Sequence, residues 1–421
     1  MVQNNIYGGS IVSNRAVSRF YTFFSMSAFN TTAAASNAST LPLTSATPSV
    51  EDQAAEILRL KRTIAQLHGA VSLGANKRLA STVTLGRGIR RAVSLFQDIP
   101  SLVSEADRRA EEEDDDSEES TGPTTEVTSD SQRNRDRTFE AYKQLVLMIP
   151  AFERNLLNTD GAALASYFAM LTRGANDARS DDISTMKKAL ANWLNKRPST
   201  KPPLNPEDRI NRGLQHDTTG GLLCPIEFDW DNIEIRAKLR ACEEGFDMSS
   251  SYFIRCFYKG GKGDAQNVEE GFLRGFLLVK AYSLVFTSPS SANRVIDDAD
   301  NENTAPSGST SSPKATKYSV AQKLNLNTVT PRSIAYVAVL LHFSLTDAPH
   351  WKSTFNNLSY ELMYNFIIDF FEDTSGPQAE DRIKSLFKWW NKQIFPVRAA
   401  AMAGSRASMN KLREQRAQRE A

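Results

Sequence analysis

The stretch TPRSIAYVAVLLHFSL, residues 330–345, decides the fold of this chain. Thr330 has a side chain that caps helix N-termini, and Pro331 suits the first helical position, where its missing N–H costs nothing. The residues after Pro331 are apolar on almost every face of a helix. This apolar run is too short to cross a bilayer, so it predicts a central helix that other elements surround.

Helical periodicity continues on both sides of this segment. Apolar residues recur at spacings of three and four, whereas the alternation typical of half-buried strands is almost absent. Ser180 is placed to cap a helix whose first turn holds Asp181 and Asp182, where carboxylates interact favourably with the helix dipole. The sequence therefore predicts a mainly α protein, a single irregular multi-helix domain, with helices over 86–103 (ending near Pro100), 139–149, 164–171, 180–194, 232–242, 250–258, 268–286, 358–371 and 382–395 (ending at Pro396).

Two biased stretches interrupt this pattern. The first, 105–136, begins with an acidic run and continues with Ser, Thr, Gly and Pro, and the second, 288–318, is rich in Ser, Thr, Asn and Asp. Runs of like charge and low-complexity polar stretches bury too little apolar surface to fold. We expect an acidic linker at 105–136, a low-complexity insertion at 288–318, both disordered, and one helical domain over 86–397.

The composition is balanced and indicates an intracellular protein. The 421 residues carry 50 Lys and Arg against 49 Asp and Glu, so global charge selects no partner. Cys224, Cys242 and Cys256 are an odd number without metal-ligand spacing, which is typical of free thiols in a reducing compartment. We expect a soluble nuclear or cytoplasmic protein with no membrane segment.

The N-terminal region divides into an arm and a short helix. Residues 1–50 contain no Asp or Glu and are rich in Ser, Thr, Ala and Asn, which fits a disordered arm or, alternatively, a mitochondrial transit peptide. Within 51–75, apolar residues at alternating spacings of three and four form a coiled-coil-like seam. Such a helix either self-associates or packs on its own domain, through Ile57, Leu60, Ile64, Leu67 and Val71.

Catalytic and metal-binding patterns are weak throughout the chain. Gly260–Asp264 lacks the hydroxyl residue and the preceding strand of a phosphate-binding loop. His216 and Cys224 have the residue types of a base and a nucleophile, but only their sequence proximity supports the pairing. The pair Asp181 and Asp182 would suit magnesium only on strands that the sequence does not supply. We therefore expect no enzymatic activity, no cofactor and no metal site.

Basic patches are the more specific functional signal. Lysines recur every four residues on 382–395, opposite its apolar stripe, and the basic tail 398–421 adds six Lys and Arg against two Glu. A lysine row with an aromatic residue can follow a phosphate backbone and stack on a base, although a solvated helix face has the same pattern. The candidate nucleic-acid contacts are Arg87, Arg90, Arg91, Lys384, Lys388, Trp389 and Lys392.

Five strings, taken in order, resemble a known family. They are GRGIRRAVSLF (86–96), TTGGLLCPIEFDW (218–230), GFLRGFLLVKAYSLVFTSPSSA (271–292), TPRSIAYVAVLLHFSL (330–345) and WWNKQIFP (389–396). The chain is similar over about 86–397 to uncharacterised proteins expanded in mushroom-forming (basidiomycete) fungi, known as a domain of unknown function. This resemblance implies an association with fungal mobile elements and assigns no functional residue.

Two functional hypotheses follow. The first is a non-enzymatic helical interaction or scaffold protein that engages a protein partner or self-associates through 51–75. The second is a nuclear, nucleic-acid-associated protein, linked to fungal mobile elements, that binds through its basic helix faces.

Overall fold

The computed structural model describes residues 81–115, 129–246, 251–295 and 319–420. Within these ranges the chain is 68% helical and has almost no strand, which confirms the predicted mainly α class. Two-residue strands β1 (Thr354–Phe355) and β2 (Leu358–Ser359) pair antiparallel. The predicted arm 1–50 and the helix 51–75, with its seam residues, lie outside the described residues. The helices are α2 Ile89–Ala92, α3 Ile99–Asp115, α4 Ser129–Met148, α5 Phe152–Asn158, α6 Gly161–Leu194, α7 Asp217–Leu223, α8 Ile233–Ala241, α9 Phe276–Tyr282, α10 Pro289–Arg294, α11 Val320–Lys323, α12 Pro331–Leu345, α13 Tyr360–Glu372, α14 Pro377–Ile394 and α15 Pro396–Glu420, with short η1 Gly213–Gln215, η2 Arg255–Phe257, η3 Lys259–Gly261 and the π-helical η4 Ser283–Thr287.

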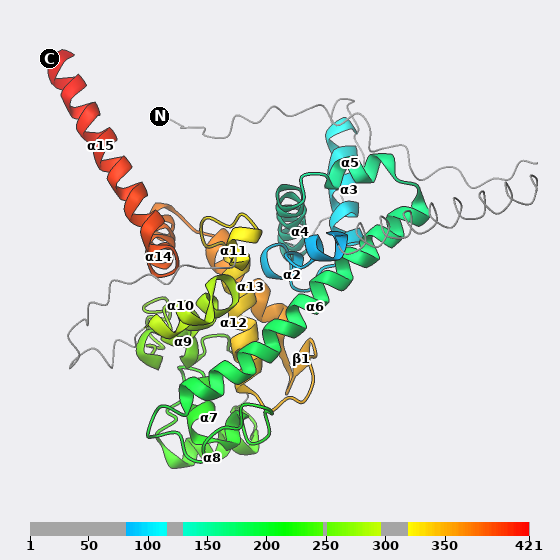
Figure 1. The fold of residues 1–421 in the computed structure, drawn as a ribbon. Helices are drawn as coiled ribbons and strands as arrows, with labels where there is room; N and C mark the ends of the chain where they lie inside the picture. Colours follow the sequence, from blue (N-terminus) through cyan, green and yellow to red (C-terminus); the bar gives the residue numbers. More distant parts are fainter. Residues whose placement is uncertain (1–80, 116–128, 247–250, 296–318, 421) are drawn as a thin grey trace, which may run out of the picture.

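The helix α12 is the centre of the fold, as its sequence predicts. Every residue after Pro331 is buried, and α12 contacts α2, α6, α7, α9 and α13 (Figure 1). Its N-terminus is a capping box, in which the Thr330 hydroxyl accepts from the Ser333 N–H and the Ser333 side chain accepts from the Thr330 N–H. The cap satisfies backbone donors that would otherwise be buried without partners.

The long helix α6 joins two hydrophobic clusters. Its N-terminal half contributes Leu171 and Ala175 to a cluster with α2, α3, α4 and α5. Its C-terminal half contributes Met186 and Leu190 to the larger core around α12, α13 and α14. Figure 1 shows α6 running past α12 along most of the described structure. The helix therefore fixes the position of the N-terminal cluster relative to the central helix.

The prediction that a helix starts at Ser180 is wrong, because α6 runs through this position without a break. Asp182 does not interact with a helix N-terminus but lies buried in the helix middle. Arg91 donates to it through Nε and Nη2 at 2.7 and 2.6 Å, and the Tyr336 hydroxyl donates to Oδ2 at 2.7 Å. One carboxylate thus ties α2, α6 and α12 together, and burial is tolerated because the charge is paired and hydrogen-bonded.

The segment 86–103 is not one helix ending near Pro100. Residues 81–86 are helical, α2 has only four residues, and α3 begins at Ile99, so that Pro100 lies in the first turn of a new helix. Proline is tolerated in a first helical turn, where its missing N–H has no intrahelical partner. Glycine permits the close approach of the segment 81–86 to α6, since a Cβ on Gly86 would lie 2.1 Å from the Leu171 carbonyl oxygen.

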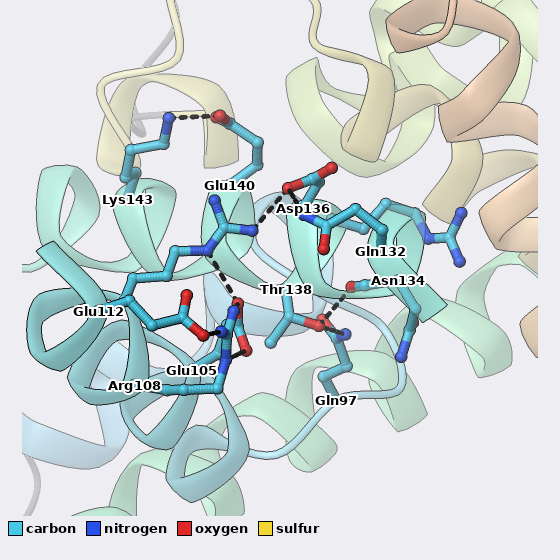
Figure 2. Close-up of polar contacts among 12 residues, drawn as sticks. Gln97, Glu105, Arg108, Glu112, Gln132, Asn134, Asp136, Thr138, Glu140 and Lys143 are labelled. Atoms are coloured by element: carbon cyan, nitrogen blue, oxygen red, sulfur yellow. Dashed lines mark hydrogen bonds and ion pairs between the residues drawn. The ribbon is translucent and has the colours of Figure 1, made fainter. Parts of the chain in front are cut away.

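The acidic stretch 105–136 is ordered over much of its length, which corrects the prediction of a disordered linker. Residues 105–115 belong to α3 and 129–136 to α4, and 116–128 lies outside the described residues. The reason is a set of contacts between arginines and acidic residues. Arg108 donates to Glu105 (Figure 2). Arg109 also donates to Glu105 and reaches Asp136 on α4 at 2.6 Å. The two arginines offset part of the acidic charge of α3 and connect this helix to α4.

Further along the chain, two predicted helices are shorter than their apolar patterns suggest. Over the described part of the first one, 251–258, only η2 is helical, and 268–286 becomes helical only at Phe276. Leu273 has a φ of 55° and its carbonyl accepts from the Trp390 indole N–H at 3.1 Å. Because a left-handed residue ends an α-helix and its carbonyl is bonded to α14, the helix starts after this point.

The second predicted insertion, 288–318, also begins too early. Ser288 caps α10 by accepting from the Ser291 N–H, and Ser319 caps α11 with a capping box. Of the predicted insertion 288–318, the part 296–318 lies outside the described residues. The helix predicted over 232–242 is confirmed as α8, which Asn232 caps.

The buried carboxylate of Asp182 generates a stability prediction. Asp182→Asn leaves the Arg91 guanidinium buried without a countercharge, so we expect the free energy of unfolding to fall by about 3–5 kcal/mol in urea or guanidinium titrations. The matched control is Asp181→Asn, whose carboxylate is 65% exposed in a pair with Arg87 and should cost less than about 1 kcal/mol. Equal losses from both variants would contradict the role given to Asp182.

Candidate nucleic-acid interface

The helix α14 presents a lysine row to solvent. Its apolar face is buried in the core through Ile383, Leu386, Trp390 and Ile394. Lys384, Lys388 and Lys392 are exposed and follow one another at one-turn intervals. The structure therefore places the predicted row on the surface, where it is accessible to a partner.

The three lysines differ in their local partners. Lys384 Nζ lies 3.1 Å from Glu380 and 3.5 Å from Asp381 in the first turn of the same helix. Within the described part of the chain, Lys388 and Lys392 have no carboxylate partner. The usable positive charge of α14 is therefore concentrated toward its C-terminal end.

Trp389 is half-buried beside these lysines. The Arg274 guanidinium lies 5.5 Å from the centre of its ring, and Trp390 packs against it edge-to-face at 5.7 Å between ring centres. Sequence reasoning missed Arg274, because it belongs to a loop more than one hundred residues earlier in the chain. It adds a half-buried cation to the surface and occupies part of the ring that was predicted to stack on a base.

The basic tail forms the helix α15, which extends away from the rest of the molecule (Figure 1). Nearly all of its described residues are exposed. At 100° per residue, four of its arginines fall in one sector of the helix, spaced by eight, seven and three residues. This arginine face consists of Arg398, Arg406, Arg413 and Arg416.

The end of α14 and most of α15 form a continuous positive segment. Between Lys388 and Arg413 the chain contains six Lys and Arg and no Asp or Glu. None of these six side chains forms an ion pair with another described residue. In a chain with a net charge of +1, this places a strong local positive field on one projecting element.

The remaining predicted contacts do not belong to this surface. Arg90 and Arg91 are only 9% and 6% exposed, and Arg91 pairs with Asp182, so their assignment as nucleic-acid contacts is wrong. Their helix α2 packs on α6 and α12, and this burial could not be read from the GRGIRR string. Arg87 is partly exposed but pairs with Asp181 at 2.7 Å.

The candidate nucleophile Cys224 and the candidate base His216 form hydrogen bonds with other groups and not with each other. The His216 ring accepts from the Thr218 N–H at 3.1 Å, capping α7, and its other nitrogen lies 2.7 Å from the Pro202 carbonyl oxygen. The Cys224 thiol is directed at the Pro225 carbonyl oxygen at 3.3 Å. Burial raises the pKa of Cys224 from 9.0 to about 11, the opposite of what an activated thiolate requires.

His342 and the glycine-rich loop 260–264 likewise show no arrangement typical of a catalytic or phosphate-binding site. Burial lowers the pKa of His342 to about 3, and its ring lies 3.3 Å from the Tyr360 hydroxyl. The glycine-rich loop contains η3, with Gly260 and Gly261 at positive φ. Among the described residues no His, Cys, Asp and Glu side chains gather into a metal-binding group. None of the helices in those ranges has both the length and the hydropathy needed to cross a membrane.

Over its described residues, the protein is a mainly α-helical domain with a basic surface on its last two helices. The chain belongs to a family of unknown function, DUF6698, whose model matches residues 173–395, more than half of its length. The match ends at α14 and includes α12, whereas the resembling string at 86–96 lies before it. Neither the curated proteins nor the solved structures contain a match to the chain.

The environments of the cysteines predict a strong difference in reactivity. At pH 8, the raised pKa of Cys224 leaves about a hundredfold less thiolate than an ordinary thiol would have, and burial blocks access as well. We expect iodoacetamide to alkylate exposed Cys242 in the native protein, while Cys224 and the buried Cys256 react only after denaturation. Peptide mass spectrometry resolves the three sites, and rapid native labelling of Cys224 would contradict this assignment.

Proposed function

We propose that this protein is a non-catalytic helical module that binds the phosphate backbone of nucleic acid through α14 and α15. The observation that carries the proposal is the run from Lys388 to Arg413, whose six Lys and Arg side chains are exposed and which contains no acidic residue. Nucleic acid suits this surface because its phosphates carry negative charge at regular intervals along the backbone. A nuclear location and a link to mobile elements would both accord with such a ligand.

The dimensions of α15 suit a polyanion. Its 25 residues span about 37 Å at the rise of an α-helix, close to one turn of duplex DNA at about 34–36 Å. Arginine and lysine side chains on such a rod release counterions from the phosphates that they neutralise. Contacts of this kind orient a protein on nucleic acid and carry no sequence information.

A protein partner is a second candidate, favoured by exposed apolar residues on the same helix. Met402, Met409 and Leu412 are 45%, 47% and 38% exposed. At 100° per residue the two methionines lie in the sector of the arginine face, and Leu412 lies next to it. An amphipathic helix with acidic flanks would cover such a stripe. Replacing these three residues by Ser should abolish that mode of binding and leave the salt dependence of nucleic-acid binding unchanged.

Self-association through Ile57, Leu60, Ile64, Leu67 and Val71 remains a prediction, since these residues lie outside the described ranges. Light scattering on a chain that begins at Gly86 tests it, because loss of a dimer would assign the contact to the removed segment.

Salt-dependent binding tests the nucleic-acid proposal. We expect fluorescence anisotropy with a labelled 20-base-pair duplex to show binding that weakens steeply with added NaCl. The triple variant Arg398→Gln, Arg406→Gln, Arg413→Gln should lower affinity by at least about tenfold at low salt. If each arginine neutralises one phosphate, the slope of log K against log salt should become shallower by about 2–3.

The matched control removes three positive charges from other exposed positions, as Arg154→Gln, Lys262→Gln, Lys323→Gln. These residues are exposed and lie on or near α5, η3 and α11, outside the arginine face. A charge effect without a defined surface would weaken binding equally in both triple variants. That result, or no binding of the unmodified protein at low salt, would overturn the proposal.

A further inference from the structure

Two arginines at the junction of α2 and α6, Arg90 and Arg179, form no ion pair with any acidic residue of the described ranges. The Arg90 side chain, only 9% exposed, donates from Nη1 to the Gln97 carbonyl oxygen at 2.7 Å and from Nε to Asn176 Oδ1 at 3.4 Å. Arg179 is half-buried with its guanidinium 5.1 Å from the centre of the Trp351 ring. Among the described residues it forms neither a hydrogen bond nor an ion pair.

The residues around Arg90 and Arg179 form a closed series of contacts. Asn176 and Arg179 lie one turn apart on α6, so their side chains share a face. Arg179 covers Trp351, and Trp351 stacks on Phe96 with 6.2 Å between ring centres. Gln97 follows Phe96 in the chain, and its carbonyl oxygen accepts the hydrogen bond from Arg90. The two guanidinium groups thus border one small patch of surface.

The contrast with the adjacent arginines is informative. Close by, Arg87 pairs with Asp181 and Arg91 pairs with Asp182. Arg90 and Arg179 form no ion pair with a described carboxylate, and the Asp98 carboxylate acts on Arg90 only over a longer distance. Burial lowers the pKa of both unpaired groups, and the neighbouring charge of Arg179 lowers that of Arg90 further. Bringing two guanidinium groups together without an ion-paired carboxylate is unfavourable, and a bound anion would reduce that cost.

We infer that Arg90 and Arg179 form a binding site for a compact phosphate-class oxyanion. Guanidinium groups present planar, paired N–H donors that match phosphate oxygens, and Asn176 supplies a further amide at the rim. An aromatic ligand does not suit the patch, because the Trp351 ring is already packed against Arg179, Phe96 and Tyr360.

The ligand is either a free phosphate ion or a phosphate monoester, which share the same oxyanion. The site belongs to α2 and α6 and is independent of the proposed arginine face on α15. It therefore goes beyond the nucleic-acid function and can be tested separately.

Calorimetric titration of the full chain with inorganic phosphate, at constant ionic strength, tests the site. We expect saturable binding that Arg179→Gln weakens by about tenfold to a hundredfold, the range for loss of a hydrogen bond to a charged group. A parallel titration with O-phosphoserine distinguishes the two sources, because tighter binding of the monoester identifies it as the preferred ligand. Binding of either anion supports the site, provided that it depends on Arg179.

The matched control is Arg173→Gln, on the same helix, where the side chain is 76% exposed and lies 3.9 Å from Asp177. This variant removes the same charge and should bind phosphate as the unmodified protein does. Arg90→Gln should also abolish binding, and if this buried substitution prevents folding, the half-buried Arg179 still decides the result. Absence of saturable binding, or equal affinity in the Arg179 and Arg173 variants, would overturn the inference.

The triple substitution on α15 separates this result from the proposed function. It should reduce duplex binding and leave the phosphate titration unchanged. If it abolished phosphate binding as well, the anion would be bound by α15 and the α2–α6 site would be rejected.

Discussion

The ion pair between Arg91 and Asp182 is the interaction on which the arrangement of helices depends. Asp182 lies on α6 between the two hydrophobic clusters that this helix joins, and its remaining oxygen capacity is used by Tyr336 on the central helix. Apolar packing alone would permit small shifts of α2 along α6. A buried carboxylate with three directed donors permits only one register, because any shift would leave a charge without its partner.

The protein distributes its arginines among distinct physical roles. Some pair with acidic residues of neighbouring helices, as Arg109 does between α3 and α4, and others project from α15 without an ion pair to any described residue. A third group lies in the interior and is held by carbonyl oxygens or aromatic rings, and Arg212 is its clearest member, since it donates to the Ser344, Lys187 and Asn205 carbonyl oxygens. Arginine count and net charge therefore say little about the surface, and the position of each guanidinium group must be known before a partner is proposed.

Both proposals concern anions but rest on different physics. On α15, an exposed rod of cations binds through long-range attraction and counterion release, so salt should control its affinity. At the α2–α6 junction, a small number of donors in a partly desolvated site would bind one oxyanion through short, directed hydrogen bonds, which salt screens much less.

The sequence by itself determined the helical class, the central helix and the lysine row of α14, because caps, apolar periodicity and one-turn spacing are local properties of the chain. It also identified α15 as strongly basic, although not as a helix. Only the tertiary structure decided which charges are buried. The strings that hold Arg90, Arg91 and Asp182 look like solvated helix faces, and the acidic run at Glu105 looks disordered, since their partners lie on other helices. Long-range pairing of charges leaves no periodic signal in the sequence, and it separates the internal arginines of this protein from those that face solvent.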